Sequence, residues 1–484
     1  MGGFFFHQCV ISVIISSYMA KDKVKIHFFG GAGDVTGSNF LIETTRLEKN
    51  VRILIDCGLY QGRQIGEDRN REAFPYEPAS IDYLFVTHSH IDHVGRIPKL
   101  VRDGFRGKII STPPTMDLAE AMLTDSMGVL AKESKYDHKP PIYEAVDVER
   151  SMSLWESIPY GKTYNIGPIG VVLRDSGHVL GSAMIEFHYN GKKIVFTGDL
   201  GNTPTPLLRN TEVLTDTNYL IMESVYGDRT HEHTKERRER LENVIEDTFR
   251  KRGTLMIPAF SLERTQEILY EIERMMEQDR IPLVPVYIDS PLAIKVFDVY
   301  KKYESYFNKD VLYLMNKGNE IFNFPQLHFT NATEESKAID QSPLPKIIIA
   351  GSGMSNGGRI LHHEKRFLPD ARNTLLLIGY QAAGTLGRRL QDGDRRVTIH
   401  GQSVEVRATI ATIGGYSAHK DSPALLEFVA ATLESLEHVY TVMGEPKSAM
   451  FLAQRIRDYL GVMATAPSAG DVVEIELWGE WWND

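Results

Sequence analysis

The feature that most constrains this chain is a group of three histidines and one aspartate placed directly after an apolar run. The run Tyr83–Thr87 has the length and composition of a buried strand, and residues 88–93 then read His-Ser-His-Ile-Asp-His. Imidazole and carboxylate groups are ligands that suit zinc, and catalytic zinc sites leave one position open for water. A single histidine is usually a surface or core residue, but this spacing at a strand end favours a metal centre.

Three further potential ligands follow the same local pattern. Asp56, His178 and Asp199 each come shortly after an apolar run rich in β-branched residues, with a glycine close by. Open α/β architectures place functional groups on loops beyond the strand ends, so these side chains can meet there. One such turn alone would indicate only turn chemistry. Together with residues 88–93, and in this order, the set predicts one metal centre.

The second half of the chain indicates an additional domain. The next histidine that fits the centre, His419 in Gly-Tyr-Ser-Ala-His, comes far beyond Asp199. Structureless loops longer than about 15 residues are uncommon in compact domains, so the intervening segment must fold by itself. It alternates apolar strands with amphipathic helices, among them Thr254–Pro258, Leu262–Gln278 and Lys346–Ala350. This alternation predicts a parallel sheet covered on both faces. Helix 234–250 should pack its apolar face on that sheet.

The ligand motifs resemble those of the metallo-β-lactamase superfamily, and the intervening segment resembles the β-CASP domain of RNA-processing nucleases. The second resemblance rests on motifs around Glu223, Pro258, Asp289, Gly351 and Gly379, which occur in family order. It implies an α/β fold, an αββα metallo-β-lactamase sandwich with an inserted parallel α/β β-CASP domain. The expected boundaries are an extension over 1–20, a sandwich formed by 21–210 and 400–484, and the insert over 211–399.

The resemblance also implies a binuclear centre with zinc in both sites, and manganese as an alternative. The first metal would be bound by His88, His90 and His178, and the second by Asp92 and His93, with Asp199 bridging both. Asp56 would orient a ligand histidine by hydrogen bonding.

For catalysis the resemblance implies three residues. Asp92 belongs to the metal centre, and His419 would donate a proton to the leaving ribose oxygen or bind the phosphate. Glu223 would keep His419 protonated, because a carboxylate partner raises a histidine pKa. A buried structural role is the alternative for Glu223.

The glycine-rich segment 351–359 follows an apolar strand and precedes a helix expected from about Gly358. Successive N–H groups there can form an anion nest at a helix N-terminus. Taken alone the segment would be a turn, whereas the resemblance favours phosphate binding. The expected phosphate or RNA contacts are Ser352, Gly353, Met354, Arg359 and Arg264, with Arg388 and Arg389 as further candidates.

Two residues depart from the family pattern. Met443 stands where the family usually has a histidine that binds the second metal, and a thioether is a poor ligand in a nitrogen- and oxygen-rich site. Artemis-type DNA nucleases of the superfamily also lack that histidine, so activity is still expected, but the occupancy of the second site stays open. Glu263 replaces a residue that is often glycine, a change that the sequence does not explain.

Composition sets limits on the function. The net charge of −10 is not that of a general nucleic-acid binder, so basic residues must gather locally around the site. Two cysteines exclude a disulfide framework. The apolar stretch within residues 1–17 is too short to span a bilayer and lacks the basic start of a secretory signal. We expect residues 1–18 to come from an upstream start codon, and a membrane-associating segment is the alternative. We also expect the protein to be cytoplasmic.

The resemblance therefore implies a metal-dependent nuclease that hydrolyses RNA, as an endonuclease or a 5′–3′ exonuclease, with a hydroxide activated by two metals. The alternatives are a DNA nuclease of the same superfamily, an RNA-binding pseudo-nuclease, and a small-ester or thioester hydrolase. The retained ligands favour activity, and the insert argues against a small acyl substrate. RNA is the expected partner, and a homodimer is left open.

Overall fold

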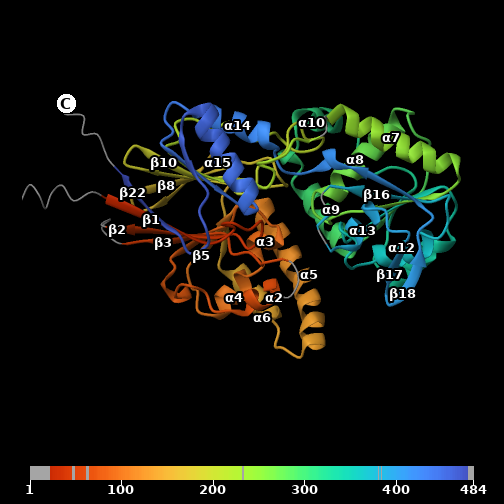
Figure 1. Cartoon of the computed structure of the whole chain (residues 1–484), viewed down its shortest axis with the longest axis horizontal. Helices are drawn as coiled ribbons and strands as arrows, with labels where there is room; N and C mark the ends of the chain where they lie inside the picture. The colour runs from red at the N-terminus through yellow and green to blue at the C-terminus, as the bar shows by residue number, and fades with distance from the viewer. Residues whose placement is uncertain are drawn as a thin grey trace, which may run out of the picture.

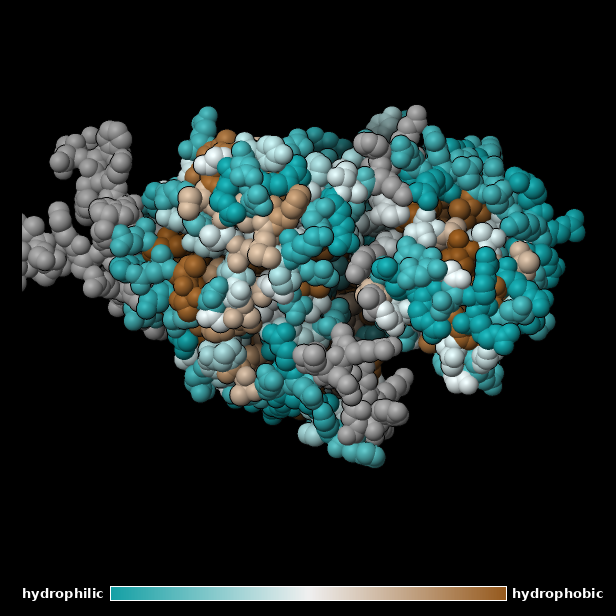
Figure 2. Space-filling model, viewed as in Figure 1, coloured by the Kyte–Doolittle hydropathy of each residue, from teal (hydrophilic) through white to brown (hydrophobic). Residues whose placement is uncertain are grey.

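The structure is a computed structural model that describes residues 22–45, 50–61, 65–231, 234–379, 381–382 and 384–477. The expected extension over residues 1–20 lies outside the described residues. Figure 1 shows two lobes side by side, one carrying β1 to β10 with α14 and α15, and the other carrying α7 to α13. In the same view hydrophilic side chains cover much of both lobes (Figure 2).

The first lobe is built on two sheets. One has the order β22 (Val472–Leu477), β1 (Asp22–Gly30), β2 (Asn39–Thr45), β3 (Arg52–Ile55), β4 (Tyr83–Phe85), β5 (Lys108–Ser111) and β6 (Trp155–Ser157). The other has the order β21 (Met463–Thr465), β20 (His438–Val442), β11 (Tyr219–Glu223), β10 (Lys192–Phe196), β9 (Ala183–Tyr189), β8 (Ile169–Asp175) and β7 (Thr163–Ile166).

Helices cover the outer faces of this pair of sheets. One buried apolar cluster lies between the sheets. It contains Phe28 and Phe85 of one sheet and Phe196 and Ile221 of the other. Side chains on the outer faces pack in separate clusters against helices, because successive residues of a strand point to opposite faces. These helices are α4 (Ile97–Arg102), α5 (Pro113–Asp137) and α6 (Ala145–Ser153) on one side, and α14 (Ser422–Ala430) and α15 (Pro446–Leu460) on the other. The predicted αββα sandwich is confirmed.

The second lobe contains a parallel sheet. Its order is β14 (Leu327–Phe329), β13 (Val286–Asp289), β15 (Lys346–Ala350), β12 (Thr254–Pro258), β16 (Thr374–Ile378) and β19 (Thr409–Ile413). One face packs on α7 (Thr234–Arg250), α8 (Arg264–Glu277), α9 (Pro291–Lys302) and α10 (Lys309–Asn316), and the other on α12 (Ile360–Phe367) and α13 (Leu386–Gln391). The predicted parallel sheet with both faces covered is confirmed, and Leu241 and Ile245 of α7 are buried against it.

Shorter elements complete the described chain. They are α2 (Ile65–Arg71), α3 (Ile91–Val94), α11 (Thr333–Ala338), the hairpin β17 (Arg396–Ile399) and β18 (Gln402–Glu405), and 3₁₀ turns at Pro78–Ser80, Glu304–Tyr306, Ile339–Gln341 and Gly414–Tyr416. Within the described residues, no helix combines the length and apolar character needed to cross a bilayer.

Strand pairing places both domain boundaries later than the sequence suggests. β11 pairs with β10 and β20, so the sandwich continues past residue 210 to Glu223. β19 pairs with β16, so the sheet of the insert continues past residue 399 to Ile413. Both strands are short apolar runs whose sheet membership depends on partners distant in the chain. Sequence periodicity therefore could not assign them.

Candidate metal centre and active site

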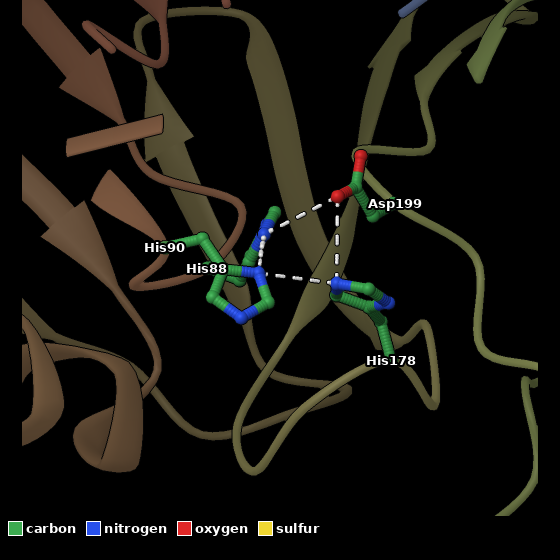
Figure 3. A group of neighbouring side chains, drawn as sticks. All are labelled: His88, His90, His178 and Asp199. Atoms are coloured by element: carbon green, nitrogen blue, oxygen red, sulfur yellow. Dashed lines mark hydrogen bonds and ion pairs between the residues drawn. The ribbon is translucent and has the colours of Figure 1, made fainter. Parts of the chain in front are cut away.

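The four donors His88, His90, His178 and Asp199 converge at the ends of three strands (Figure 3). His88 and His90 follow β4, His178 follows β8 and Asp199 follows β10. His90 Nδ1 lies 3.0 Å from His88 Nε2 and 3.2 Å from His178 Nε2. Asp199 Oδ2 lies 3.5 Å and 3.4 Å from the same two Nε2 atoms. Three imidazoles and one carboxylate aimed at one point are a donor set that fits a metal such as zinc.

A second pair of donors lies next to the first group. His93 Nε2 and Asp199 Oδ1 are 3.6 Å apart, both side chains are buried, and neither atom has a hydrogen-bond partner among the described residues. Buried polar atoms are almost always satisfied, so this orphaned nitrogen and oxygen fit a second metal. Asp92 immediately precedes His93 in α3, and burial raises the pKa of its carboxyl. Neither Asp92 nor His93 belongs to the first four converging donors.

Asp56 holds the ring of His93. Its Oδ2 accepts a hydrogen bond of 2.7 Å from His93 Nδ1 and another of 2.9 Å from the Thr87 hydroxyl. The Thr87 N–H donates to Oδ1 at 2.8 Å, and Ser38 Oγ donates to Oδ2 at 3.1 Å. With Nδ1 bound to Asp56, His93 directs Nε2 towards Asp199. Thr87 and Ser38 escaped the sequence analysis, although the position of Thr87 immediately before His88 was a usable signal.

Burial prepares the first three histidines for metal binding. It lowers the pKa of His88 and His178 well below the usual value, with further lowering by neighbouring histidines. Burial and then the charges of His93, His419 and Arg264 lower the pKa of His90 to about 3. All three imidazoles are therefore neutral at physiological pH, which is the form that binds metal.

His93 differs from these three because burial is outweighed there by the Asp199 and Asp56 carboxylates, which raise its pKa to about 10. A proton and a metal thus compete for His93.

The buried Glu223 and the half-buried His419 form a pair beside the metal donors. Glu223 ends β11 and accepts a hydrogen bond from the Leu200 N–H. His419 Nδ1 lies 3.1 Å from Glu223 Oε2 and 3.9 Å from Asp199 Oδ2. Burial lowers the pKa of His419, but the Glu223 and then the Asp199 carboxylate outweigh it and raise that pKa to about 9. His419 therefore carries a proton at neutral pH and can donate it. The three residues could also hold a cation, but Glu223 is already engaged by Leu200 and His419.

Comparison with known proteins identifies the fold and the family. Residues 32–244 match the Metallo-beta-lactamase superfamily, residues 265–390 the Beta-Casp domain and residues 403–467 the Zn-dependent metallo-hydrolase RNA specificity domain. Ribonuclease TTHA0252 of Thermus thermophilus is 35% identical over 426 residues, which are 88% of this chain and 94% of that protein. The chain belongs to the β-CASP metallo-hydrolases.

Other relatives agree with this membership. Transcription termination factor FttA of Methanosarcina mazei is 32% identical over 467 residues, 92% of this chain and 71% of the factor. The crystal structure of a protein of unknown function from Enterococcus faecalis V583 superposes with a TM-score of 0.55 at 12% identity. The superposition covers 94% of this chain and 100% of the Enterococcus chain. At 12% identity the likeness shows the fold alone.

In this β-CASP metallo-hydrolase, the arginines expected to bind phosphate are engaged within the fold. Arg359 donates to Asp289 Oδ1 at 2.7 Å and to two backbone carbonyl oxygens. Arg264 is buried, donates to the Tyr416 carbonyl oxygen and pairs with Glu267. The ion-pair partners of Arg388 and Arg389 are Asp392 and Asp394, respectively. The Arg359 guanidinium is thus engaged within the insert, and its contact with phosphate or RNA stays a prediction.

The glycine-rich segment folds back on itself. Ser352 Oγ accepts from the N–H groups of Asn356 and Gly357 at 3.0 Å and 3.3 Å. The helix begins at Ile360, later than expected. A Cβ placed on Gly353 would lie 2.8 Å from the ring of Phe260, whose side chain is 45% exposed. This exposed ring, which the sequence analysis did not single out, is available for stacking with a base.

Met443 lies in the core of the sandwich. It is 2% exposed, has φ of 46° and donates its N–H to the Gly31 carbonyl oxygen at 2.5 Å. A Cβ placed on Gly31 would lie 2.3 Å from the sulfur of Met443. Met443 also lines a small cavity together with Asp56 and Thr87. The effect of this methionine on the second metal stays a prediction.

Proposed function

We propose that this metallo-hydrolase cleaves RNA phosphodiester bonds at a centre of two zinc ions. The observation that carries the proposal is the position of His419, which pairs with Glu223 beside the converging metal donors, 3.9 Å from Asp199 Oδ2. The RNA specificity match at residues 403–467 and the ribonuclease name of the Thermus relative support RNA as substrate and partner. A cytoplasmic location is proposed on the same grounds.

Each residue has a proposed role. One metal would be held by His88, His90 and His178. The other would be held by His93 and Asp92, and Asp199 would bind both metals. Bound zinc supplies Lewis-acid chemistry, since it activates water near neutral pH and withdraws charge from a phosphate. Asp56 keeps His93 in the tautomer that offers Nε2.

Protonation of the leaving group falls to His419. Its ring is held by Glu223 through Nδ1, which leaves Nε2 free to face a substrate. A water oxygen would form the new bond to phosphorus while the bond from phosphorus to the 3′ oxygen breaks. Donation from Nε2 to that leaving oxygen would give a 3′-hydroxyl on one product and a 5′-phosphate on the other. Manganese is the alternative metal, because the same nitrogen and oxygen donors suit it.

The test is incubation of the metal-loaded protein with end-labelled RNA, end-labelled DNA and a thioester. We expect RNA to be cleaved to 5′-phosphate products, and the Asp199→Asn variant to lose metal and activity together. Cleavage of DNA in preference to RNA would favour the DNA nuclease. Tight RNA binding without turnover would favour the pseudo-nuclease, and thioester hydrolysis alone would refute a nuclease.

A further inference from the structure

The segment 415–419, which ends in His419, links the insert to the sandwich. It lies between β19, which ends at Ile413, and α14, which begins at Ser422. Between these two elements the chain forms one 3₁₀ turn and isolated bridges at His419 and Asp421, in place of a continuous strand or α-helix. Most of its carbonyl oxygens therefore depend on donors from elsewhere in the molecule, and those donors decide where His419 lies.

The carbonyl oxygens of all five residues of this segment accept hydrogen bonds from distant parts of the chain. Asn202, in the loop after β10, donates its backbone N–H to Ala418 at 2.8 Å and its side-chain amide to Ser417 at 3.3 Å. Arg264 of α8 donates to the carbonyl oxygen of Tyr416. The other two carbonyl oxygens lie at the two ends of the segment, and each accepts from one further side chain.

Arg237 of α7 holds the end that lies against the insert. The residue is buried, and its Nη1 donates to the Gly415 carbonyl oxygen at 3.0 Å. Its Nη2 lies 3.7 Å from Glu271 Oε1, and its guanidinium carbon lies 4.9 Å from the centre of the Tyr416 ring. The Tyr416 hydroxyl donates to the same Glu271 carboxylate. A buried charge must be paired to be tolerated, so these contacts keep the guanidinium in one place beside Gly415.

His231 holds the other end of the segment. Its Nε2 lies 3.0 Å from the His419 carbonyl oxygen, and Nε2 carries the hydrogen because a carbonyl oxygen only accepts. Its backbone N–H donates to Asp421 Oδ2 at 3.0 Å. Its ring also packs edge-on against Tyr226, with the ring centres 4.6 Å apart. His231 is thus held at three points beside the residue that it supports.

We infer that Arg237 and His231 are positioning residues, which hold the backbone of segment 415–419 at its two ends and so fix the proton donor His419 beside the metal centre. The inference rests on the proposed hydrolysis of RNA. Both side chains act through the main chain, whereas Glu223 holds the ring of His419 itself. Loss of either bond would let this ring move relative to a bound phosphate, while the four converging metal donors stay in place.

The experiment separates proton donation from the rest of the reaction by the choice of leaving group. The ribose oxygen that leaves RNA needs a proton, whereas the p-nitrophenolate ion that leaves bis(p-nitrophenyl) phosphate is stable without one. A residue that positions the proton donor should therefore matter more for RNA than for the small diester. The measurements on the metal-loaded enzyme are kcat and KM for both substrates, metal content and Tm.

The variants are Arg237→Gln and His231→Ala, each alone and combined with His419→Ala. Arg238→Gln is the matched control, because Arg238 is the next residue of α7 but donates to Gln278 at the end of α8. His231→Gln tests rescue, since glutamine also presents an N–H donor. His231 is half-buried, so His231→Ala keeps the test decisive if Arg237→Gln does not fold.

In Arg237→Gln and in His231→Ala we expect kcat for RNA to fall by about 10- to 100-fold, because a small misplacement of a reacting group has effects of this size. KM for RNA and metal content should resemble those of wild type, and the small diester should be affected far less. Combined with His419→Ala, neither change should lower kcat for RNA much further, since residues that act as a unit are not additive. His231→Gln should recover most of the lost activity, and Arg238→Gln should resemble wild type.

Unchanged kcat for RNA in a folded Arg237→Gln or His231→Ala enzyme would overturn the inference. Equal losses on both substrates, or a full further loss when either change is combined with His419→Ala, would also overturn it, because the role would then not depend on His419. A His419→Ala enzyme that cleaves RNA as fast as wild type would instead refute the proton donor of the proposed function, and this inference with it.

Discussion

At the scale of single residues, His419 illustrates how charge assigns a chemical role. Its half-buried ring lies near the Glu223 and Asp199 carboxylates, which raise its pKa to about 9. A histidine that acts as an acid is active below its folded-state pKa and loses activity as the pH rises through it. The alkaline limb of the activity profile should therefore report His419.

Replacing Glu223 by glutamine should move that limb to lower pH, because the largest charge that raises the pKa of His419 is removed. His419→Ala should lower kcat by about 10²- to 10⁴-fold, the usual contribution of a general acid. The measurements for both variants are activity as a function of pH and metal content by emission spectrometry. Metal loss in His419→Ala would contradict the role of proton donor and indicate a ligand.

Met443 is expected to weaken the second metal site. Purified protein should keep fewer than two metals per chain through dialysis, and activity should rise when zinc or manganese is restored. Met443→His should tighten the site by about 10- to 100-fold, the range for losing or restoring one supporting group. Metal content after dialysis is the measurement. Two metals retained by the wild type would mean that another residue supplies the missing ligand.

At the scale of elements, the end of β13 is held by a buried carboxylate. Asp289 accepts hydrogen bonds from His363 at 2.7 Å, Arg359 at 2.7 Å, Ser336 at 2.6 Å and Thr330 at 2.7 Å. Burial raises its pKa, but these donors outweigh burial and hold the pKa below the usual value. Through these bonds Asp289 ties β13 to α11 and α12, and thereby supports the glycine-rich segment.

Asp289→Asn should destabilise the protein by about 2–4 kcal/mol at neutral pH, because buried donors lose a charged acceptor. The folded-state pKa is lowered, so the stabilisation is present above the unfolded-state pKa of about 3.9 and is lost as the pH falls below it. Chemical denaturation at pH 7 and pH 3 measures the difference. Asp370→Asn, which removes a surface pair with Arg372, is the control and should change stability by less than about 1 kcal/mol. Equal effects of the two variants would contradict the supporting role.

At the scale of the whole molecule, charge limits how RNA is bound. The net charge is −10, and the four arginines expected to contact RNA are paired with acidic side chains. These four arginines then offer little unpaired charge to neutralise phosphates. We expect the plot of log affinity for RNA against log salt to have a slope shallower than about −3, measured by filter binding with an inactive Asp199→Asn protein. A slope of about −6 or steeper would show that an extensive basic surface binds RNA.

Local patterns in the sequence determined the elements and the order of the metal donors. Apolar runs predicted β8, β10 and β12, and a 3.6-residue repeat predicted α7 and its buried face. The histidines of residues 88–93 stand out because their spacing is itself the signal. Such features depend on neighbours along the chain and can be read without a structure.

Only the tertiary structure decided the partners of the charged side chains. The Arg359 guanidinium donates to Asp289, and Asp56 accepts a hydrogen bond from His93 rather than from another histidine. The sheet membership of β11 and β19 was decided in the same way. Each of these contacts joins segments far apart in sequence, and its strength depends on burial and geometry that exist only once the chain has folded.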